Sequence, residues 1–598
     1  MDNLKKIFEL LTPDERKLSY FLLILILIMA FIDMLGVASI LPFVSVLTNP
    51  EMIQTNFILK FLYKKSEFLG VNDERKFLFL LGFSVFIFLI LSLTFKAFTT
   101  YVQTRFSLMR EYSIGKRLIE GYLSQPYPWF LNKNSAYLGK NILSQVSHVV
   151  NQAIFTMINL IAQTAVSLAI ISLLIVVSPK IAIQVGLVLI FSYGLIFYLV
   201  KNFLSYIGNE NIKANENRFT VVSEAFGSIK EIKFKGLEKN YIKNFSAPAE
   251  KFAVFQSLSQ VTSVIPRFFM EIIAFGGIII LILYLMSKGG NFNDIIPIIT
   301  LYVFAGYRLM PALQQIYYAT AQIRFAKKAL NTLHSDLKNL KNYEILPHEN
   351  IDQISVNKNI ILKNINYKYP NSKNSVLKGI DFKIQAFTKV GIVGFTGSGK
   401  TTLIDIILGL LEADQGDIYI DEKLISSKNK KSWQKIIGYV PQQIYLADKT
   451  VAENIAFGVD KNKIDQNAIE EAAKIANLHE FVINNLSQKY ETIIGERGVR
   501  LSGGQRQRIG IARAVYNKPQ VLILDEATSS LDSLTEKEVM KAINKLGKKV
   551  TIILIAHRLS TVKDCDKIFL LEEGKLKAEG SYDDLIQMDN IFKNMASI

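Results

Sequence analysis

A glycine-rich stretch in the second half of the chain has the spacing of a phosphate-binding loop. The pattern G-x-x-x-x-G-K-[ST] is satisfied within GIVGFTGSGKTTL (391–403) by Gly394, Gly399, Lys400 and Thr401. Small residues let consecutive backbone N–H groups wrap the phosphates of a nucleotide, Lys400 reaches the β- and γ-phosphates, and the Thr401 hydroxyl is placed for Mg²⁺. The plainer alternative is a glycine-rich turn in front of a helix.

The flanking residues favour the phosphate loop over a simple turn. KVGIV (389–393) is mostly apolar and predicts a buried strand. Residues 401–411 predict a helix, whose N-terminus then faces the phosphates.

Two further stretches carry residues suited to nucleotide hydrolysis. The apolar run VLIL (521–524) ends in Asp525 and Glu526. A carboxylate at the end of a buried strand can hold Mg²⁺ through water, and the adjacent Glu526 can accept a proton from attacking water. LSGGQ (501–505) exposes backbone donors at the start of a predicted helix, where they can bind a phosphate. An ordinary helix-capping turn is the alternative for LSGGQ.

His557 follows a third apolar run, TIILIA (551–556). A lone histidine at the end of a strand is more often structural than catalytic. Because His557 follows the acidic strand in this chain, the catalytic interpretation is favoured here.

The composition of the whole chain limits the class of protein that carries these motifs. The 598 residues are too many for one domain, half of them are hydrophobic, and the mean hydropathy is +0.24. Lys and Arg number 69 against 52 Asp and Glu, a net charge of +17. Without a basic low-complexity tail, this excess predicts loops facing a cytoplasmic membrane surface and no nucleic-acid partner. The single Cys565 excludes an intrachain disulfide framework and fits a reducing compartment.

The first half predicts a membrane domain. Residues 1–19 predict an amphipathic surface helix with a capping box at Thr12 and Glu15, and no cleavable signal peptide is expected, because the first apolar run is long and carries Asp33. Long apolar runs predict six spans, near 20–46, 77–104, 152–178, 181–200, 260–286 and 295–321. The basic excursions 105–151 and 201–259 place both termini in the cytoplasm. The stretch 56–69 predicts a short amphipathic helix at the outer interface.

The predicted domains are therefore an N-terminal helix (1–19), a six-helix membrane domain (20–332), a linker (333–356) and a soluble α/β P-loop ATPase domain (357–598).

Three basic residues lie within or near the apolar spans: Lys96, Arg267 and Arg308. Charges in lipid are costly, so such groups usually face a cavity or a partner. The functional interpretation is an anion-attracting cavity. The alternatives are snorkelling of Lys96 to the headgroups and a structural pair between Arg267 and Glu271.

The order of motifs GFTGSGKT, YVPQ, LSGGQ, LILDEATSSLD and AHRLS resembles the nucleotide-binding domain of ATP-binding cassette (ABC) transporters. With six predicted spans ahead of it, the whole chain resembles a half-transporter of the ABC exporter type. The resemblance implies ATP and Mg²⁺ as cofactors.

The resemblance also assigns roles to individual residues. For ATP binding it implies adenine stacking by Tyr369 and a Walker A loop at 394–402, with Gly394, Gly397, Ser398, Gly399, Lys400, Thr401 and Thr402. For hydrolysis it implies Mg²⁺ ligation by Thr401, Gln442 and Asp525, and catalysis by Glu526, His557 and Gln442. It also implies a D-loop residue, Asp532, and a signature that completes the partner's ATP site, at Ser502, Gly503, Gly504 and Gln505. Because no motif is degraded, the chain is expected to form a homodimer with two equivalent ATP sites.

A second, weaker resemblance indicates which substrate is transported. FAGYRLMP (304–311) and IPRF (265–268) look like the membrane domain of PglK-type lipid-linked oligosaccharide flippases. This implies ATP-driven flipping of a polyisoprenyl-diphosphate glycan across the bacterial inner membrane, with Lys96, Arg267 and Arg308 receiving the diphosphate. The alternatives are a multidrug or peptide exporter and, in another class, a soluble DNA-repair ATPase, which the six spans disfavour.

Overall fold

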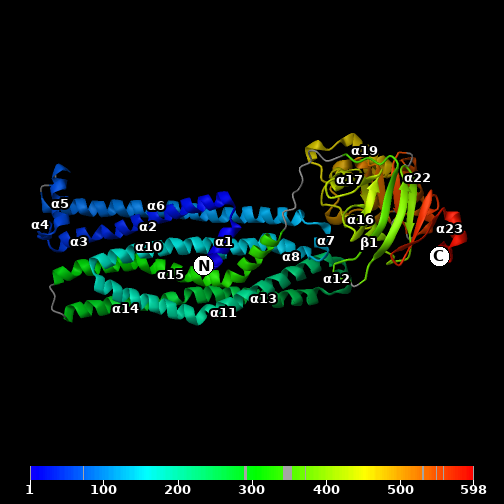
Figure 1. Cartoon of the computed structure of the whole chain (residues 1–598). Coiled ribbons are helices and arrows are strands. Elements are labelled where there is room, and N and C mark those ends of the chain that lie inside the picture. Colours follow the sequence, from blue (N-terminus) through cyan, green and yellow to red (C-terminus); the bar gives the residue numbers. More distant parts are fainter. Residues whose placement is uncertain are drawn as a thin grey trace. The chain divides into compact units, whose positions relative to one another are not determined.

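The computed structural model describes residues 2–69, 71, 73–287, 292–340, 353–370, 372, 374–527, 531–546, 549–556 and 558–596. These residues form two compact units (Figure 1). The first comprises Met1–Gln125 and Trp129–Ile345, and the second comprises Pro126–Pro128 and Leu346–Ile598.

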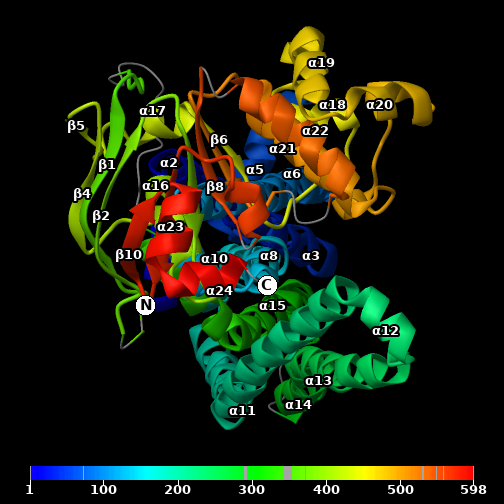
Figure 2. The same ribbon diagram turned by 90° about the vertical axis from the view of Figure 1, so that its right-hand side faces the viewer.

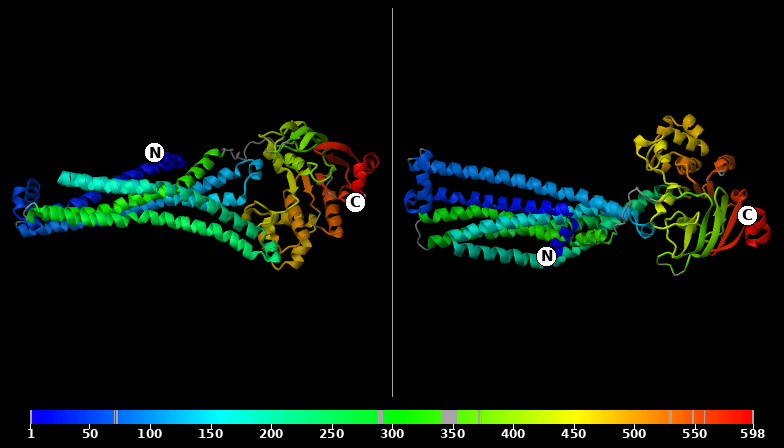
Figure 3. Two further views of the ribbon diagram at one scale, coloured as in Figure 1. Left: turned by 90° about the horizontal axis from the view of Figure 1, so that it is seen from below. Right: turned by 45° about the horizontal axis from the view of Figure 1, so that its top comes forward.

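The first unit is built from helices; one of them, α7, begins in the Pro126–Pro128 segment assigned to the second unit. They are α1 (Asp2–Leu10), α2 (Pro13–Ala38), α3 (Ile40–Thr48), α4 (Met52–Thr55), α5 (Phe57–Ser66), α6 (Glu74–Leu123), α7 (Tyr127–Leu131), α8 (Ser135–Lys140), α9 (Val146–Val149), α10 (Thr156–Val177), α11 (Pro179–Gly227), α12 (Ile229–Lys235), α13 (Glu238–Val264), α14 (Pro266–Ser287) and α15 (Phe292–Asn339). The long helices run alongside one another (Figure 3). Helix α10 packs against α2, α11 and α15, and α11 packs against α13 and α15.

Five helical stretches in the described part of the chain are long and apolar enough to cross a membrane. They are Pro13–Thr48, Glu74–Leu123, Ser135–Val177, Ala182–Gly227 and Glu238–Gly277. The sixth predicted span, 295–321, lies inside helix α15. The predicted class of a helical membrane domain followed by an ATPase domain is therefore confirmed.

The chain before the first span departs from the single helix predicted over 1–19. Helix α1 ends at Leu10, and α2 begins at Pro13 and continues into the first apolar run. The predicted capping box causes this restart: Thr12 Oγ1 accepts from the backbone N–H of Glu15, and Glu15 Oε2 accepts from that of Thr12 at 2.9 Å.

The end of α15 also departs from the prediction. The helix continues to Asn339, inside the interval predicted as a linker. Leu330, Leu333 and Leu337 follow a helical spacing and pack into one apolar cluster, which extends the helix beyond residue 332.

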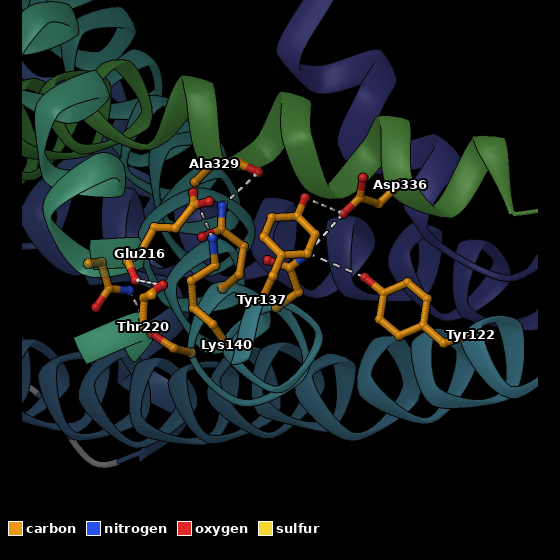
Figure 4. A network of polar contacts seen from close by, with 11 residues as sticks. Tyr122, Tyr137, Lys140, Glu216, Thr220, Ala329 and Asp336 are labelled. Carbon is orange, nitrogen blue, oxygen red and sulfur yellow. Dashed lines mark hydrogen bonds and ion pairs between the residues drawn. The ribbon is translucent and has the colours of Figure 1, made fainter. Parts of the chain in front are cut away.

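Two π-helical turns, Asn141–Gln145 and Val150–Phe155, interrupt the helix that leads into α10. A polar network surrounds the first turn (Figure 4). Asn141 Nδ2 donates to Tyr122 OH at 3.3 Å and to Asp336 Oδ2 at 3.0 Å, and Lys140 Nζ lies 3.4 Å from Glu216 Oε2. The network therefore ties this turn to α6, α11 and α15.

The second unit contains two sheets (Figure 2). A four-stranded antiparallel sheet has the order β2-β1-β4-β5, with β1 (Asn359–Tyr367), β2 (Leu377–Gln385), β4 (Gln415–Ile420) and β5 (Lys423–Leu424). A six-stranded sheet has the order β10-β9-β3-β8-β7-β6, with β3 (Lys389–Val393), β6 (Ile437–Val440), β7 (Val521–Asp525), β8 (Thr551–Ile555), β9 (Lys567–Glu572) and β10 (Lys575–Gly580).

The strands β6, β7, β8, β3 and β9 pair in parallel, and β10 is antiparallel to β9. Parallel strands buried on both faces read as continuous apolar runs, which is why VLIL and TIILI form strands. Alternate residues of β7 pack into two different apolar clusters. Leu522 and Leu524 belong to one cluster, and Val521 and Ile523 belong to the other. The carboxyl ends of β3 and β7 meet at one edge of the sheet.

Helices complete this unit. They are α16 (Lys400–Ile407), α17 (Lys430–Lys435), α18 (Val451–Ile455), α19 (Gln466–Ile475), α20 (His479–Asn485), α21 (Gly503–Tyr516), α22 (Ser533–Leu546), α23 (Tyr582–Met588) and α24 (Asn590–Ala596). Helix α16 stops earlier than the predicted 401–411, because Gly409 adopts a φ of 68° just after its C-terminus.

Candidate nucleotide-binding site

The loop between β3 and α16 has a backbone that only glycine permits at two positions. A Cβ on Gly394 would collide with the carbonyl oxygen of Leu571. Gly399 has a φ of 97°, and a Cβ there would lie 2.8 Å from the Leu377 side chain. The loop therefore wraps in front of the first N–H groups of α16, as the phosphate-binding interpretation requires.

Lys400 is held inside this loop. Its Nζ donates to the carbonyl oxygens of Gly394 at 2.7 Å and Phe395 at 3.0 Å. Burial lowers the pKa of Lys400, while the nearby carboxylates Glu526 and Asp525 act in the opposite direction. A desolvated ammonium group bound to neutral carbonyls is well suited to exchange them for phosphate oxygens.

Ser398 Oγ gives a second indication that this loop binds a phosphate. This hydroxyl is buried and has no hydrogen-bond partner among the residues that the structure describes. A buried hydroxyl without a partner costs free energy. A phosphate oxygen in the loop would supply that partner, so the residues present fit a nucleotide.

The acidic residues lie at the carboxyl end of β7. Asp525 is 5 % exposed, and Glu526, which follows it, has a φ of 49°. Gln442 Nε2 donates to Glu526 Oε2 at 2.8 Å. The structure therefore brings together two of the three predicted catalytic residues; the third, His557, lies outside the described residues.

One carboxylate near this edge was missed by the sequence analysis. Asp405 lies on α16, and burial together with the Asp525 carboxylate raises the pKa of Asp405 to about 6. Burial, with Asp525 and Asp405 beside it, also raises the pKa of Tyr439 on β6. Negative charge therefore accumulates around Asp525, and a cation there is electrostatically favourable. Mg²⁺, which binds one or two carboxylates together with nucleotide phosphates, fits this surrounding.

Tyr369, the predicted adenine-stacking residue, is fixed from two sides. Its hydroxyl and Thr402 Oγ1 are 3.0 Å apart in a hydrogen bond, and the Tyr367 ring meets it edge-on with centroids 5.1 Å apart. The Thr402 hydroxyl is thus bound to the tyrosine, which ties the aromatic ring to helix α16.

The LSGGQ stretch forms the start of α21. Ser502 Oγ accepts from the Gln505 backbone N–H at 3.2 Å, and Gln505 Oε1 accepts from the Ser502 N–H at 2.8 Å. These side chains thus serve as a capping box, the structural alternative considered for this motif. The N–H groups of Gly503 and Gly504 belong to the first turn, where four donors have no partner within a helix.

Asp532 also serves as a helix cap. Its Oδ1 accepts from the backbone N–H groups of Leu534 at 3.2 Å and Thr535 at 2.9 Å. These contacts position the side chain at the start of α22. The D-loop assignment of Asp532 stays a prediction.

The two arginines of the predicted membrane cavity each have an acidic partner. Arg267 Nε lies 2.7 Å from Glu271 Oε1, as the structural alternative proposed, with side chains 55 % and 33 % exposed. Arg308 NH1 lies 3.0 Å from Asp33 Oδ1, and these side chains are 14 % and 2 % exposed. Lys96 is half-buried on α6.

The Asp33 contact was not foreseen. Ser92 Oγ on α6 donates to Asp33 Oδ1 at 2.7 Å, so one carboxylate of α2 joins α6 and α15. An acid within an apolar run was the signal available in the sequence, because such a residue requires a partner in a membrane.

Comparison with known proteins agrees with this geometry. The ABC transporter family model matches residues 377–529. The ATP-dependent lipid A-core flippase of Wigglesworthia glossinidia brevipalpis is 30 % identical over 494 residues, covering 80 % of this chain and 82 % of the relative. ABC transporter B family member 29, chloroplastic, of Arabidopsis thaliana is 32 % identical over 447 residues, covering 74 % and 69 %.

A solved bacterial Atm1-family ABC exporter with ATP bound shares the fold. Its TM-score is 0.75 at 21 % sequence identity, and the match covers 97 % of this chain and 98 % of that one. A helical membrane domain, a P-loop ATPase domain and relatives matched over most of their length lead to one conclusion: the chain is an ATP-driven translocase of the ABC transporter family, a half-transporter of the exporter type.

Proposed function

We propose that two copies of the chain bind two ATP molecules, each between the phosphate loop of one copy and the LSGGQ helix of the other. Lys400 and the orphan Ser398 hydroxyl hold the phosphates, and Tyr369 stacks on the adenine. The start of α21, at the half-buried Gly503 and Gly504, supplies backbone donors to the partner's nucleotide.

Glu526 acts as the general base in this proposal. The 2.8 Å hydrogen bond from Gln442 orients its carboxylate for accepting a proton from water. Thr401, Gln442 and Asp525 would hold Mg²⁺, which supplies positive charge to the phosphates. His557 is assigned to the γ-phosphate by family resemblance.

The proposed cargo is a lipid-linked oligosaccharide, a polyisoprenyl-diphosphate glycan, moved across the bacterial inner membrane with the ATPase domain in the cytoplasm. The observation that carries this proposal is the pair of arginines in the membrane unit, Arg267 and Arg308, each oriented by one carboxylate contact. A guanidinium has five N–H donors, so one contact leaves others for a diphosphate. The relatives named as lipid A-core flippases support a glycolipid cargo.

An apolar face of α6 favours a second candidate function. It carries Ile87, Ile90, Leu91, Thr94, Phe95 and Phe98. It suits an isoprenyl chain, but also a hydrophobic drug. A multidrug exporter is therefore the alternative.

Stimulated ATP hydrolysis separates the two candidates. The protein reconstituted in liposomes is given a polyisoprenyl-diphosphate oligosaccharide, a lipid A-core glycolipid or a hydrophobic cationic drug, each at several concentrations. The proposal predicts saturable stimulation by the first compound at the lowest concentration. Stimulation by the drug alone would support the multidrug exporter and contradict the lipid-linked oligosaccharide.

A further inference from the structure

A small pocket in the membrane unit is lined by hydrogen-bonding side chains and tyrosine rings. It has a volume of about 100 Å³ and lies between α11, α13, α14 and α15, with Tyr193, Ser263, Arg267, Gln314, Gln315 and Tyr318 in its wall. This is room for several water molecules or for one edge of a sugar ring. Polar groups inside a membrane bundle are costly and usually functional.

The Tyr193 hydroxyl lacks a partner in this pocket. Its oxygen is buried and forms no hydrogen bond within the described part of the chain. The ring itself is held by Tyr317, with centroids 5.8 Å apart. A fixed ring that buries an unused hydroxyl indicates a ligand that bonds to it.

The amide side chains of the pocket are held in place by a chain of hydrogen bonds. Gln163 Nε2 donates to Asn159 Oδ1 at 3.3 Å, and Asn159 Nδ2 donates to Gln315 Oε1 at 3.1 Å. This occupies the oxygen of Gln315 and leaves its amide nitrogen as a donor.

The wall of the pocket offers more than a site for an anion. Arg267 uses Nε for the contact with Glu271 at 2.7 Å, which leaves its other N–H groups for the diphosphate. The hydroxyl and amide groups beside it match a ligand rich in hydroxyl groups, because hydroxyls both donate and accept. Tyrosine rings offer apolar faces for the carbon skeleton of such a ligand.

We propose that this pocket binds a sugar residue of the transported glycolipid through the Tyr193 hydroxyl and the Gln315 amide, next to Arg267, which contacts the diphosphate. The inference rests on the proposed function and adds that the transporter recognises the glycan as well as the diphosphate.

The test compares two lipids that differ only in the sugar. Half-stimulating concentrations for ATP hydrolysis are measured with polyprenyl diphosphate and with the same lipid carrying one N-acetylhexosamine. We expect the wild-type protein to respond to the glycosylated lipid at the lower concentration. Tyr193→Phe removes no hydrogen bond made among the described residues. It should reduce about fivefold the ratio of the half-stimulating concentration of polyprenyl diphosphate to that of the glycosylated lipid. Gln315→Leu should do the same.

Tyr307→Phe is the matched control, because Tyr307 is 78 % exposed on α15 and should leave the ratio unchanged. An unchanged ratio in both Tyr193→Phe and Gln315→Leu would overturn the assignment of the pocket. A wild-type ratio of one, with both lipids stimulating, would overturn it while the proposed function stands. If neither lipid stimulates the wild type, both proposals fail.

Discussion

The contact between Asp33 and Arg308 predicts a strong energetic coupling between the first and last long helices of the membrane unit. The two charged atoms are 3.0 Å apart, the side chains are 2 % and 14 % exposed, and Ser92 adds a 2.7 Å hydrogen bond. Removing either partner leaves a buried charge without its ion-pair partner. Asp33→Leu or Arg308→Met alone should therefore reduce the free energy of unfolding by about 3–5 kcal/mol.

The double variant should behave differently. Without either charge, apolar side chains fill the site, and its stability should return to within about 1 kcal/mol of the wild type. The coupling energy of this double-mutant cycle is the sum of the two single losses minus the loss in the double variant, so it is nearly as large as the two single losses combined. Unfolding of the purified protein is followed as a function of SDS concentration for the four proteins of the cycle.

The exposed pair Arg267–Glu271 provides the comparison. Its side chains are 55 % and 33 % exposed, so the same cycle there should give a coupling below about 1 kcal/mol. Additive losses for Asp33 and Arg308, with the double variant as unstable as the two singles combined, would refute the reasoning.

Three further predictions concern the ATPase unit. Glu526→Gln should bind ATP and dimerise but barely hydrolyse it, measured by nucleotide binding, size-exclusion chromatography and phosphate release; near-native hydrolysis would contradict the assigned base. Gly394→Ala should abolish ATP binding, because the added Cβ collides with the Leu571 carbonyl; retained binding would show that the loop can shift. Asp421 accepts backbone N–H groups at 2.6, 2.7 and 2.8 Å, and although its burial acts in the opposite direction, these bonds lower the pKa of Asp421. The stabilisation is complete above the usual aspartate pKa of about 3.9 and is lost as the pH falls through the lowered value. Asp421→Asn should therefore lower the unfolding temperature at pH 7, and the decrease should be smaller below pH 3.9. An equal decrease at both pH values would contradict the explanation that the charged Asp421 carboxylate stabilises the fold.

Local features were readable from the sequence because their cause is local. The capping box at Thr12 and the buried strand before the phosphate loop follow from spacing and composition, and the structure confirms both. The motif order also predicted that Gln442 and Glu526 serve one site, and they form a hydrogen bond.

Pairings between distant helices could not be predicted in the same way. The partner of Arg308 depends on how α2 and α15 are rotated about their axes, which apolar runs do not specify when all faces of a helix are hydrophobic. The pairing of Arg267 with Glu271 could be predicted, because i,i+4 neighbours lie on the same face of a helix however the helices pack. The extension of α15 to Asn339 depended on apolar contacts made by the rest of the bundle.

ATP-dependent flipping in proteoliposomes tests the central claim most directly. The protein is reconstituted with a fluorescently labelled polyisoprenyl-diphosphate oligosaccharide, and the fraction of glycan accessible to a membrane-impermeant glycan hydrolase is followed with time. The account predicts that accessibility changes only with ATP and only when Glu526 is intact, so that Glu526→Gln behaves like the sample without ATP. An unchanged accessibility in a preparation that hydrolyses ATP at its full rate would contradict the lipid-linked oligosaccharide as cargo.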